Sequence, residues 1–351
     1  MTIRVGMIGA GQIACSHCEE IAGYKGAELA AVADLSRKRR EALAEEFKIP
    51  WATAKWEDVV ADKTIDAVTI ALPNSLHAPV SAAALKAGKH VHLDKPFTVT
   101  LREANQVAAT AKKSRKVLMV GMNMRYRPES QGLRNAIARG MLGDIYHART
   151  YWYRRAGAPK FGTWFVNKEL AGGGCLLDIG VHYLDLSLYL IDNWDPVSVT
   201  GRVTGMFGHK GVGEGGWGQS DRKKSIKFDV EDGAHGFIKF RNGMTLELGV
   251  SWAQHQSEGN MQGVELYGAK AGASLDASEI YRPKGAKGEY EIRQIPAAPK
   301  SKLRSTRIVD WLDAIKGKRE PICSVEQALV VQKILDAIYK SSATGREVRF
   351  K

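Results

Sequence analysis

The chain has 351 residues, of which 44% are hydrophobic and 25% are charged. This length predicts two domains, and the balanced composition excludes a disordered, collagenous or coiled-coil chain. The longest stretch without a charged residue, 67–85, contains proline, asparagine and histidine and is too polar to cross a bilayer. The first residues follow a strand pattern rather than a signal-peptide pattern, and the four cysteines are too scattered for a disulfide framework. We therefore expect a cytoplasmic protein that does not enter a membrane.

The net charge is +13, from 51 basic and 38 acidic residues. Eight of the basic residues lie between Arg282 and Arg307, where only Glu289 and Glu291 oppose them. Such a segment could attract nucleic acid or an anionic substrate. No nucleic-acid-binding motif accompanies it, so a solvated loop and helix face is the simpler interpretation, and we expect no nucleic-acid partner.

Residues 1–121 alternate strand and helix patterns. Thr100 and Glu103 form a capping box at the start of the last helix pattern. Near-continuous apolar strands that alternate with helices predict a parallel sheet covered on both faces. The expected strands are 4–8, 29–33, 67–71, 90–93 and 117–121, and the expected helices are 12–23, 36–47, 75–87 and 101–114.

Residues 122–351 are predicted to form a second domain with a mostly antiparallel sheet. Asn242-Gly243 between two strand patterns is a strong hairpin signal. Helices are expected at 129–139, 176–191, 302–316 and 325–341, and strands at 145–153, 197–206, 226–230, 236–240, 244–251, 262–267 and 290–295. The helices are too few to cover both faces of this sheet, and the last two could pack back on the first domain. We therefore expect a homodimer or homotetramer built on the uncovered face.

A glycine-rich turn follows the first strand. It contains Gly9, Gly11, Gln12 and Ile13, with Ala14 in the place of a third glycine. The glycines allow a tight turn and a close approach of a pyrophosphate to the start of a helix, which predicts a dinucleotide cofactor.

Asp34 ends the second strand, where a carboxylate accepts a hydrogen bond from a ribose hydroxyl and repels a 2′-phosphate. NAD is therefore favoured. Arg37 follows closely and could accommodate that phosphate, which keeps NADP as the alternative.

Polar residues follow the next two strands, at the sheet edge where open α/β sheets bind ligands. Pro73, Asn74 and His77 follow the third strand, and Asp94 and Lys95 follow the fourth. We expect Lys95 to lie beside the nicotinamide and to hold a substrate oxygen or relay its proton. The alternatives are a surface lysine at a strand end and an asparagine that only caps a helix.

Three glycines, 172–174, precede a helix that carries Asp178 and His182 four residues apart. On a regular α-helix these two side chains share a face, and a carboxylate beside an imidazole orients it and raises its basicity. This pairing suits a general base, whereas the alternative is a polar face that meets water. Asp185 continues the stripe. Asp178, His182 and Asp185 could offer metal ligands, and Cys15-Ser16-His17-Cys18 has a zinc-like spacing. A metal site is nevertheless disfavoured, because a second Cys/His pair is absent and Cys15 and Cys18 fall within the first helix.

Together these residues resemble the glucose–fructose oxidoreductase, inositol dehydrogenase and rhizopine-catabolism family (Gfo/Idh/MocA). The resemblance rests on the following residues: Gly9–Ala14, Pro73-Asn74 with His77, Asp94-Lys95-Pro96, Gly121-Met122-Asn123 with Arg125, and Gly172–His182 with Asp185. It implies an α/β chain with an N-terminal Rossmann domain and a C-terminal domain with a large open sheet, often used for subunit contacts. It also implies that Lys95, Asp178 and His182 are catalytic and that the Lys95-Pro96 bond is cis. This chain departs from the family in one respect, since Asp94 stands where a glutamate is usual.

The sequence therefore predicts an NAD(P)-dependent dehydrogenase of a sugar, polyol or glycoside. We expect His182 to remove the hydroxyl proton, Lys95 to stabilise the alkoxide, and Asp178 to orient His182. Two other classes stay open: a glycosidase that retains NAD, and a regulator that binds the cofactor without turnover. Residues on segments expected to face the cleft are Asn123, Tyr151, Tyr153, Arg154, Lys160 and Trp164, of which Asn123 is also a predicted cofactor contact.

Overall fold

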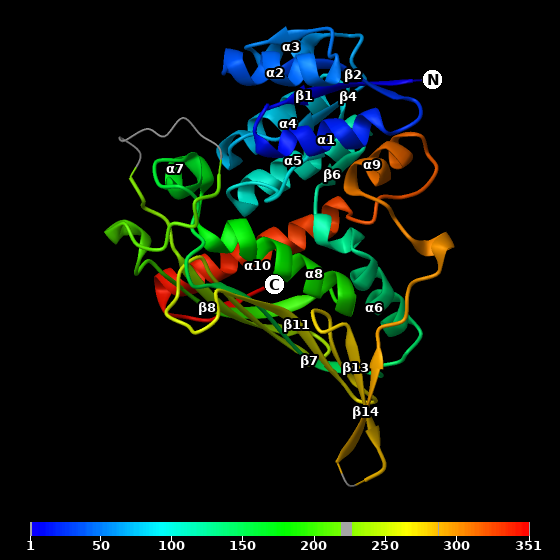
Figure 1. Cartoon of the computed structure of the whole chain (residues 1–351), viewed down its shortest axis with the longest axis vertical. Coiled ribbons are helices and arrows are strands. Elements are labelled where there is room, and N and C mark those ends of the chain that lie inside the picture. Colours follow the sequence, from blue (N-terminus) through cyan, green and yellow to red (C-terminus); the bar gives the residue numbers. More distant parts are fainter. Residues whose placement is uncertain (1, 219–226, 287, 351) are drawn as a thin grey trace.

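The computed structural model describes residues 2–218, 227–286 and 288–350. In this part of the chain two sheets are separated by a layer of helices (Figure 1), and the first sheet has the strand order β3-β2-β1-β4-β5-β6. Its strands are β1 Ile3–Ile8, β2 Ala27–Ala33, β3 Ala52–Thr53, β4 Ala67–Ile70, β5 His90–Leu93 and β6 Leu118–Val120. Every pair in it is parallel, and all four residues of β4 are buried. The predicted parallel sheet is confirmed.

Five α-helices connect these strands. They are α1 Gln12–Ala22, α2 Arg37–Phe47, α3 Trp56–Ala61, α4 His77–Lys86 and α5 Leu101–Ser114. The predicted capping box at the start of α5 is present: the Glu103 backbone N–H donates to Thr100 Oγ1 and the Thr100 N–H donates to Glu103 Oε2.

The second sheet has the order β14-β13-β12-β11-β7-β10-β9-β8-β15. Its strands are β7 Ile145–Arg154, β8 Pro196–Thr204, β9 Gly233–Phe240, β10 Thr245–Ser251, β11 Asn260–Gly268, β12 Gly272–Ser274, β13 Glu279–Lys284, β14 Glu289–Gln294 and β15 Val348–Arg349. Only the β7–β10 pair is parallel among those described, so the prediction of a mostly antiparallel sheet is confirmed. The β9–β10 hairpin turns at Asn242-Gly243 as predicted, with Gly243 at a φ of +86°.

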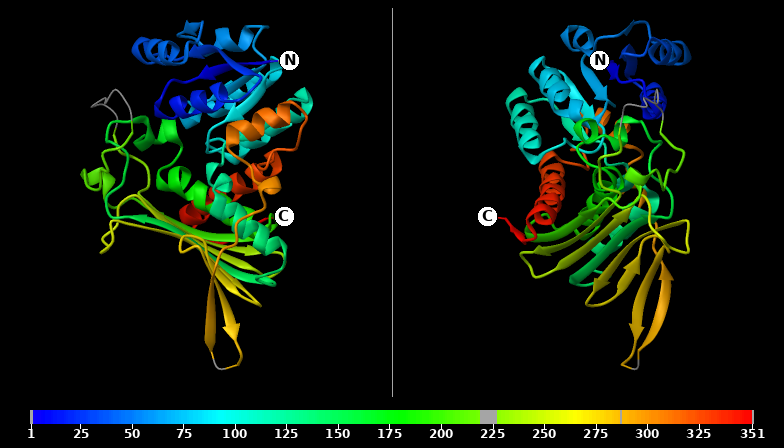
Figure 2. Two further views of the ribbon diagram at one scale, coloured as in Figure 1. Left: turned by 45° about the vertical axis from the view of Figure 1, so that its right-hand side comes forward. Right: turned by 90° about the vertical axis from the view of Figure 1, so that its left-hand side faces the viewer.

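The helices of this half lie on the side of the second sheet that faces the first sheet (Figure 2). They are α6 Pro128–Ala138, α7 Lys168–Ala171, α8 Val181–Ile191, α9 Arg307–Ile315 and α10 Val325–Thr344. No helix of the described residues lies on the opposite, outer face of the sheet, and the β13–β14 hairpin projects from one end of the sheet (Figures 1 and 2). Alternation along β7 turns Tyr151 and Tyr153 to this outer face, beside Phe237 and His235.

Three local predictions were wrong. The helix predicted at 176–191 begins as a π-helical turn, Leu176–Gly180, and only then becomes α8. Residues 227–230 form no strand, because this segment binds the loop before α7: the Asp229 N–H donates to Val166 O, and the Asp229 carboxylate accepts from the Lys168 N–H. Ile226 lies outside the described residues. Helix α9 begins after Thr306, whose hydroxyl accepts from the Val309 N–H, rather than at residue 302.

In the acidic run 229–232, Glu231 and Asp232 are buried, whereas Asp229 is exposed. Asp232 accepts hydrogen bonds from the backbone N–H groups of Met206, Phe207 and Gly208. Glu231 accepts from the Leu176 N–H and the Tyr339 hydroxyl. These carboxylates therefore anchor the start of the π-helical turn and the loop after β8.

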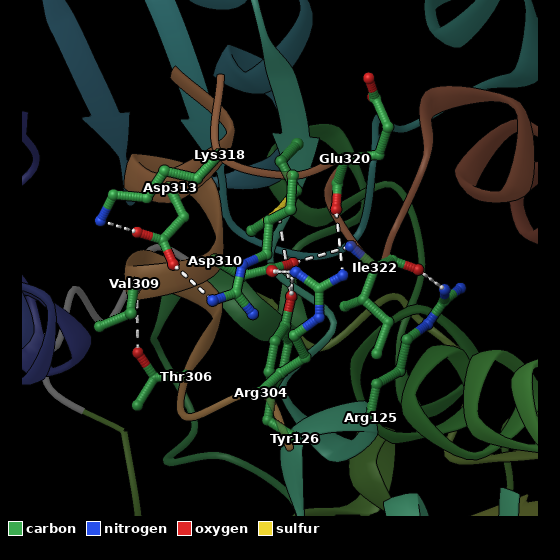
Figure 3. A network of polar contacts seen from close by, with 12 residues as sticks. Arg125, Tyr126, Arg304, Thr306, Val309, Asp310, Asp313, Lys318, Glu320 and Ile322 are labelled. Atoms are coloured by element: carbon green, nitrogen blue, oxygen red, sulfur yellow. Dashed lines mark hydrogen bonds and ion pairs between the residues drawn. The ribbon is translucent and has the colours of Figure 1, made fainter. Parts of the chain in front are cut away.

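The C-terminal helices contact the first domain. The Tyr24 hydroxyl of the segment after α1 donates to Asp313 of α9 at 2.7 Å, and the Leu101 N–H of α5 donates to Asp336 of α10 at 2.7 Å. Figure 3 shows the network around α9, in which the buried Asp310 accepts from the Tyr126 hydroxyl and from Arg304. These bonds fix α9 beside the start of the second domain.

One described stretch, Lys168–Ile191, has the length and mean hydropathy of a membrane span. However, 83% of its most apolar window is buried inside the protein. It is packed as the core helix of a folded domain.

Candidate active site

The glycine-rich turn lies between β1 and α1. Gly9 has a φ of +99°, and a Cβ there would lie 2.2 Å from Ala71 O, so the fold itself requires glycine. At Gly11 a Cβ would meet nothing within 4 Å. Gln12 and Ile13 are exposed in the first turn of α1, whose N–H groups point outward. The absence of a side chain at Gly11 leaves room for a pyrophosphate to approach the backbone at the start of α1, so these residues fit a dinucleotide.

Asp34 holds this turn in place. Its Oδ2 accepts from the Ala10 N–H at 2.8 Å, and its Oδ1 accepts from the Ser36 N–H at 2.7 Å and from Arg39 Nη2 at 3.1 Å. Arg37, which the sequence singled out, is turned away and binds Glu41 at 2.7 Å. The arginines that contact the expected ribose partner are therefore Arg39, which binds its carboxylate, and Arg40, whose Nη1 donates to Asp34 O at 3.2 Å.

The residues after β4 bind backbone carbonyls. Asn74 donates to Ala171 O at 2.8 Å, which links the first domain to α7. The buried His77 ring lies 2.8 Å from Pro96 O and 3.0 Å from Leu72 O. Pro73 directly precedes the short 3₁₀ turn Asn74–Leu76. Asn74 and His77 thus hold the loops around Lys95, and the Lys95–Pro96 bond is cis.

Asp94 is paired with a residue that sequence reasoning missed. His17 Nε2, on α1, lies 3.1 Å from both Asp94 oxygens. Burial alone would raise the pKa of Asp94, but His17 and Arg307 hold it well below its usual value. The sequence offered His17 only as part of the Cys15–Cys18 spacing, and no local signal connects it with a strand end 77 residues away.

Lys95 and Asp178 meet across the two domains. Lys95 Nζ donates to Asp178 Oδ1 at 2.8 Å and to Asp178 O at 3.0 Å. The second carboxylate oxygen, Oδ2, accepts from Trp252 Nε1 at 2.9 Å. Burial favours the neutral acid, but Lys95, His182 and Trp252 together lower the pKa of Asp178. The contact of Trp252 with Asp178 was not expected from the sequence, in which the two residues are 74 positions apart.

His182 is one turn away but is not bonded to Asp178. The π-helical turn at Leu176–Gly180 changes the regular α-helical spacing, and both Asp178 oxygens are occupied. His182 Nδ1 is buried and has no hydrogen-bond partner among the described residues. Burial and the Lys95 charge lower the pKa of His182 to about 3, against the opposing effect of Asp178. Asp178 does raise the pKa of His182, as expected, but burial and Lys95 outweigh this effect, so the net shift is downward and the ring is neutral.

A cavity of about 420 Å³ opens beside His182 and Asp178. Its remaining lining residues are Trp152, Arg154, Ala156, Gly157, Ile179, Gly215, Trp217, Gly259 and Asn260. The structure places Tyr153 elsewhere than the sequence analysis did: it lies on the outer face of the sheet, because neighbours along a strand point to opposite faces.

The other expected substrate residues are distributed around this region. Trp164 is stacked on Phe165, with the two ring centres 3.8 Å apart, and does not line the cavity. The tryptophan of this region that lines the cavity is Trp217. Asn123 is exposed at the start of the 3₁₀ turn Asn123–Tyr126. Trp217 lies in a glycine-rich loop that no sequence motif connects with the site, so this aromatic wall was not predicted.

Asp185 has a structural role. Arg125 Nε donates to Asp185 Oδ2 at 2.8 Å, and both side chains are completely buried or nearly so. Arg125 also donates to Ile322 O, as Figure 3 shows. Within residues 2–218, 227–286 and 288–350, no group of three or more His, Cys, Asp or Glu side chains is arranged to hold a metal ion.

Comparison with known proteins agrees with this geometry. Residues 3–122 match the family described as "Oxidoreductase family, NAD-binding Rossmann fold", and residues 130–274 match the GFO/IDH/MocA C-terminal domain. The chain is 34% identical to D-glucoside 3-dehydrogenase of Escherichia coli (strain K12), over 99% of this chain and 97% of that protein. It is 28% identical to 1,5-anhydro-D-fructose reductase of Ensifer adhaerens, over 98% and 97%.

A solved structure of GenD2 from gentamicin A biosynthesis, in complex with NAD, is similar with a TM-score of 0.79. Its sequence identity to this chain is 25%, and the match covers 100% of this chain and 97% of that one. The fold, the cofactor turn and both matched domains lead to one conclusion. The chain belongs to the GFO/IDH/MocA oxidoreductase family, with an NAD-binding Rossmann fold at its N-terminus.

Proposed function

We propose that the protein is an NAD-dependent dehydrogenase that oxidises a secondary hydroxyl of a sugar, polyol or glycoside. The observation that carries this proposal is the Lys95–Asp178 contact at 2.8 Å, which brings the end of β5 to the cavity lined by Asp178 and His182. A cation from the cofactor domain and a neutral imidazole from the second domain thus flank one site. The relatives named as acting on a D-glucoside and on anhydrofructose support a carbohydrate substrate.

The roles of the side chains follow from their charge. We propose that His182 accepts the hydroxyl proton and that Lys95 stabilises the developing alkoxide. Asp178 and Trp252 position Lys95 for that contact. When bound along Gly9, Gly11, Gln12, Ile13 and Asp34, NAD supplies the hydride acceptor.

The test is an assay of NADH absorbance with the purified protein and a panel of glycosides, inositols and free sugars. NADH that accumulates in proportion to oxidised sugar supports the proposal. Release of free sugar without net NADH would replace it with an NAD-retaining glycosidase. Cofactor binding without either product would replace it with a regulator, although such a protein needs neither Lys95 nor His182.

We further propose that NAD is preferred to NADP. Asp34 faces the turn at Gly11 and its negative charge repels a 2′-phosphate. Arg39, at 3.1 Å from Asp34, is the residue that would oppose this preference, in place of Arg37. Titration with both cofactors at equal ionic strength decides the matter, and tighter binding of NADP would overturn the proposal.

Finally, we propose that two or four copies of the chain associate through the outer face of the second sheet in the cytoplasm. Apolar side chains exposed on that face are Phe237, Met261 and Tyr267. Tyr151 and Tyr153 are stacked there, with ring centres 5.8 Å apart. Light scattering should give a multiple of 38.5 kDa, and a monomeric mass at micromolar concentration would contradict this proposal.

A further inference from the structure

Arg154, the last residue of β7, is held in one position at the edge of the cavity. Its guanidinium carbon lies 4.4 Å from the centre of the Trp152 ring and 5.8 Å from that of Trp217. Its Nη1 donates to Gly157 O at 3.1 Å, and the Trp217 indole donates to the same carbonyl at 2.7 Å. A Cβ at Gly157 would lie 2.3 Å from Arg154 Cδ, so glycine is required there for this position. The guanidinium is therefore fixed before any ligand arrives.

No acidic side chain of the described residues forms an ion pair with this guanidinium. Asp178 lines the same cavity, but its oxygens are bound by Lys95 and Trp252. Burial lowers the pKa of Arg154, and the charge of Asp178 only partly opposes this. An arginine has five N–H donors in a planar fork, and among residues 2–218, 227–286 and 288–350 the Arg154 guanidinium forms only the Nη1 bond to Gly157. The others remain available to a ligand.

The charges around the cavity do not balance. Lys95 and Arg154 are two cations, Asp178 is one anion, and His182 is neutral because its pKa is about 3. Removing a cation from water without a counter-charge costs desolvation free energy, and an oxyanion of the ligand would offset that cost for the half-buried Arg154. Because Arg154 and His182 line one cavity of about 420 Å³, the oxyanion and the oxidised carbon belong to one small molecule.

We propose that Arg154 is a specificity-determining residue and that the substrate is an anionic sugar derivative, with a carboxylate or phosphate bound by its guanidinium. This inference rests on the proposed dehydrogenase function. Trp152 and Trp217 keep the guanidinium plane fixed, so that paired N–H groups face the oxyanion. Asn260, which accepts from the Trp152 indole at 2.8 Å, holds the Trp152 ring in place.

The experiment compares three methyl glucopyranosides as substrates: the neutral glucoside, the glucosiduronate with a carboxylate, and the 6-phosphate. With saturating NAD, kcat/KM for one anionic compound should exceed that of the neutral compound at least tenfold, and the better anion identifies the source of the charge. Arg154→Gln should lower kcat/KM for the anionic compound about a hundredfold and that for the neutral compound by no more than about threefold. This difference corresponds to the loss of a charge-assisted, paired contact.

Arg155→Gln is the matched control. Arg155 is the next residue, is exposed, and donates to Ser257 O instead of lining the cavity, so its loss should change neither value. Equal effects of Arg154→Gln on neutral and anionic compounds would overturn the inference and leave Arg154 as part of the aromatic wall.

Binding separates this inference from the proposed function. Calorimetric titration of the NADH-loaded protein with the glucosiduronate, the 6-phosphate and the neutral glucoside requires no turnover. The inference is supported if an anionic compound binds more tightly than the neutral glucoside to wild type and this preference is lost in Arg154→Gln. This holds even if no compound reduces NAD, because the lack of NAD reduction would contradict only the dehydrogenase proposal. Equal binding of all three compounds would overturn the inference whatever the activity.

Discussion

Trp252 Nε1 donates a hydrogen bond to Asp178 Oδ2 at 2.9 Å, on the carboxylate oxygen that Lys95 does not bind. The indole is completely buried in the loop that follows β10. One carboxylate oxygen is therefore bound by Trp252 and the other by Lys95, and neither is bonded to His182. In the proposed mechanism Trp252 would therefore position Lys95 by way of Asp178.

Replacing this indole tests that relationship. Trp252→Phe keeps an aromatic ring but removes the donor, and a hydrogen bond to a charged group contributes about 1.5–3 kcal/mol. We expect kcat to fall by roughly tenfold with an unchanged NAD dissociation constant, since the cofactor turn is remote from Trp252. Trp311→Phe is the matched control: that indole is equally buried, but its Nε1 has no hydrogen-bond partner among the described residues. Equal losses of kcat in both variants would reduce Trp252 to a packing role.

His182 should be needed for turnover and not for cofactor binding. It lies in the second domain beside the cavity, whereas the glycine-rich turn and Asp34 belong to the first. General base catalysis typically contributes about a hundred- to ten-thousand-fold, so His182→Ala should lower kcat by roughly that factor. The NAD dissociation constant should stay within about twofold of the wild-type value. Wild-type turnover in the variant would assign the proton transfer to another group, with Lys95 the first to test.

The pH dependence of the wild-type protein follows from the lowered pKa of His182. With a pKa of about 3 in the folded state, this ring stays neutral throughout the neutral range. A turnover rate that rises through an ordinary histidine pKa is therefore not expected. When kcat/KM is measured against pH, the wild-type profile should show no His182-dependent inflection near pH 6.5. An inflection near pH 6.5 that is present in wild type and absent in His182→Ala would contradict this prediction.

The same shift affects stability, with a definite sign. The unfolded chain binds a proton at His182 below about pH 6.5, whereas the folded chain does so only near pH 3. The contribution of the neutral ring to the free energy of unfolding is therefore fully present above pH 6.5. As the pH falls from 6.5 toward 3, this free energy decreases by about 1.4 kcal/mol per pH unit. Urea unfolding of wild type and His182→Ala at several pH values should show a difference that shrinks on acidification. A constant difference would show that the folded pKa is not depressed.

Gly11→Ala separates cofactor binding from folding. A methyl group at Gly11 meets nothing within 4 Å in the protein, so the melting temperature should stay within about 1 °C of wild type. The methyl would occupy the space for the pyrophosphate, and NAD should bind at least about tenfold more weakly. Gly9→Ala provides the contrast, because its φ of +99° and the 2.2 Å approach to Ala71 O should destabilise the fold itself. Unchanged NAD affinity in Gly11→Ala would place the cofactor elsewhere.

Asp185→Ala should act on stability. It leaves Arg125 buried without its counter-charge, and breaking a buried ion pair costs about 3–5 kcal/mol in unfolding free energy. Replacing both residues together, as Arg125→Met with Asp185→Leu, should recover much of that loss because no charge then remains buried. Denaturant unfolding measures all three proteins. A stable Asp185→Ala variant with strongly reduced kcat would instead place Asp185 in the catalytic machinery.

Several features could be predicted from the sequence because neighbouring residues determine them. The capping box of Thr100 and Glu103 needs contacts over only three residues, and the Asn242-Gly243 turn needs two. The glycines of the cofactor turn likewise express a local requirement on the backbone. Near-continuous apolar strands gave the parallel sheet, because burial on both faces leaves no room for polar residues.

The chemistry of the site was decided by contacts between distant residues. Lys95 and Asp178 are 83 residues apart, Trp252 lies 74 residues after Asp178, and His17 lies 77 residues before Asp94. The regular helical spacing predicted the wrong partner for His182, since a π-helical turn intervenes and Lys95 and Trp252 occupy the Asp178 oxygens. A pKa depends on burial and on every nearby charge, and the face on which Tyr153 or Arg154 lies depends on the register of the whole sheet. Neither can be determined from adjacent residues, because both arise only when distant segments exclude water from a shared space.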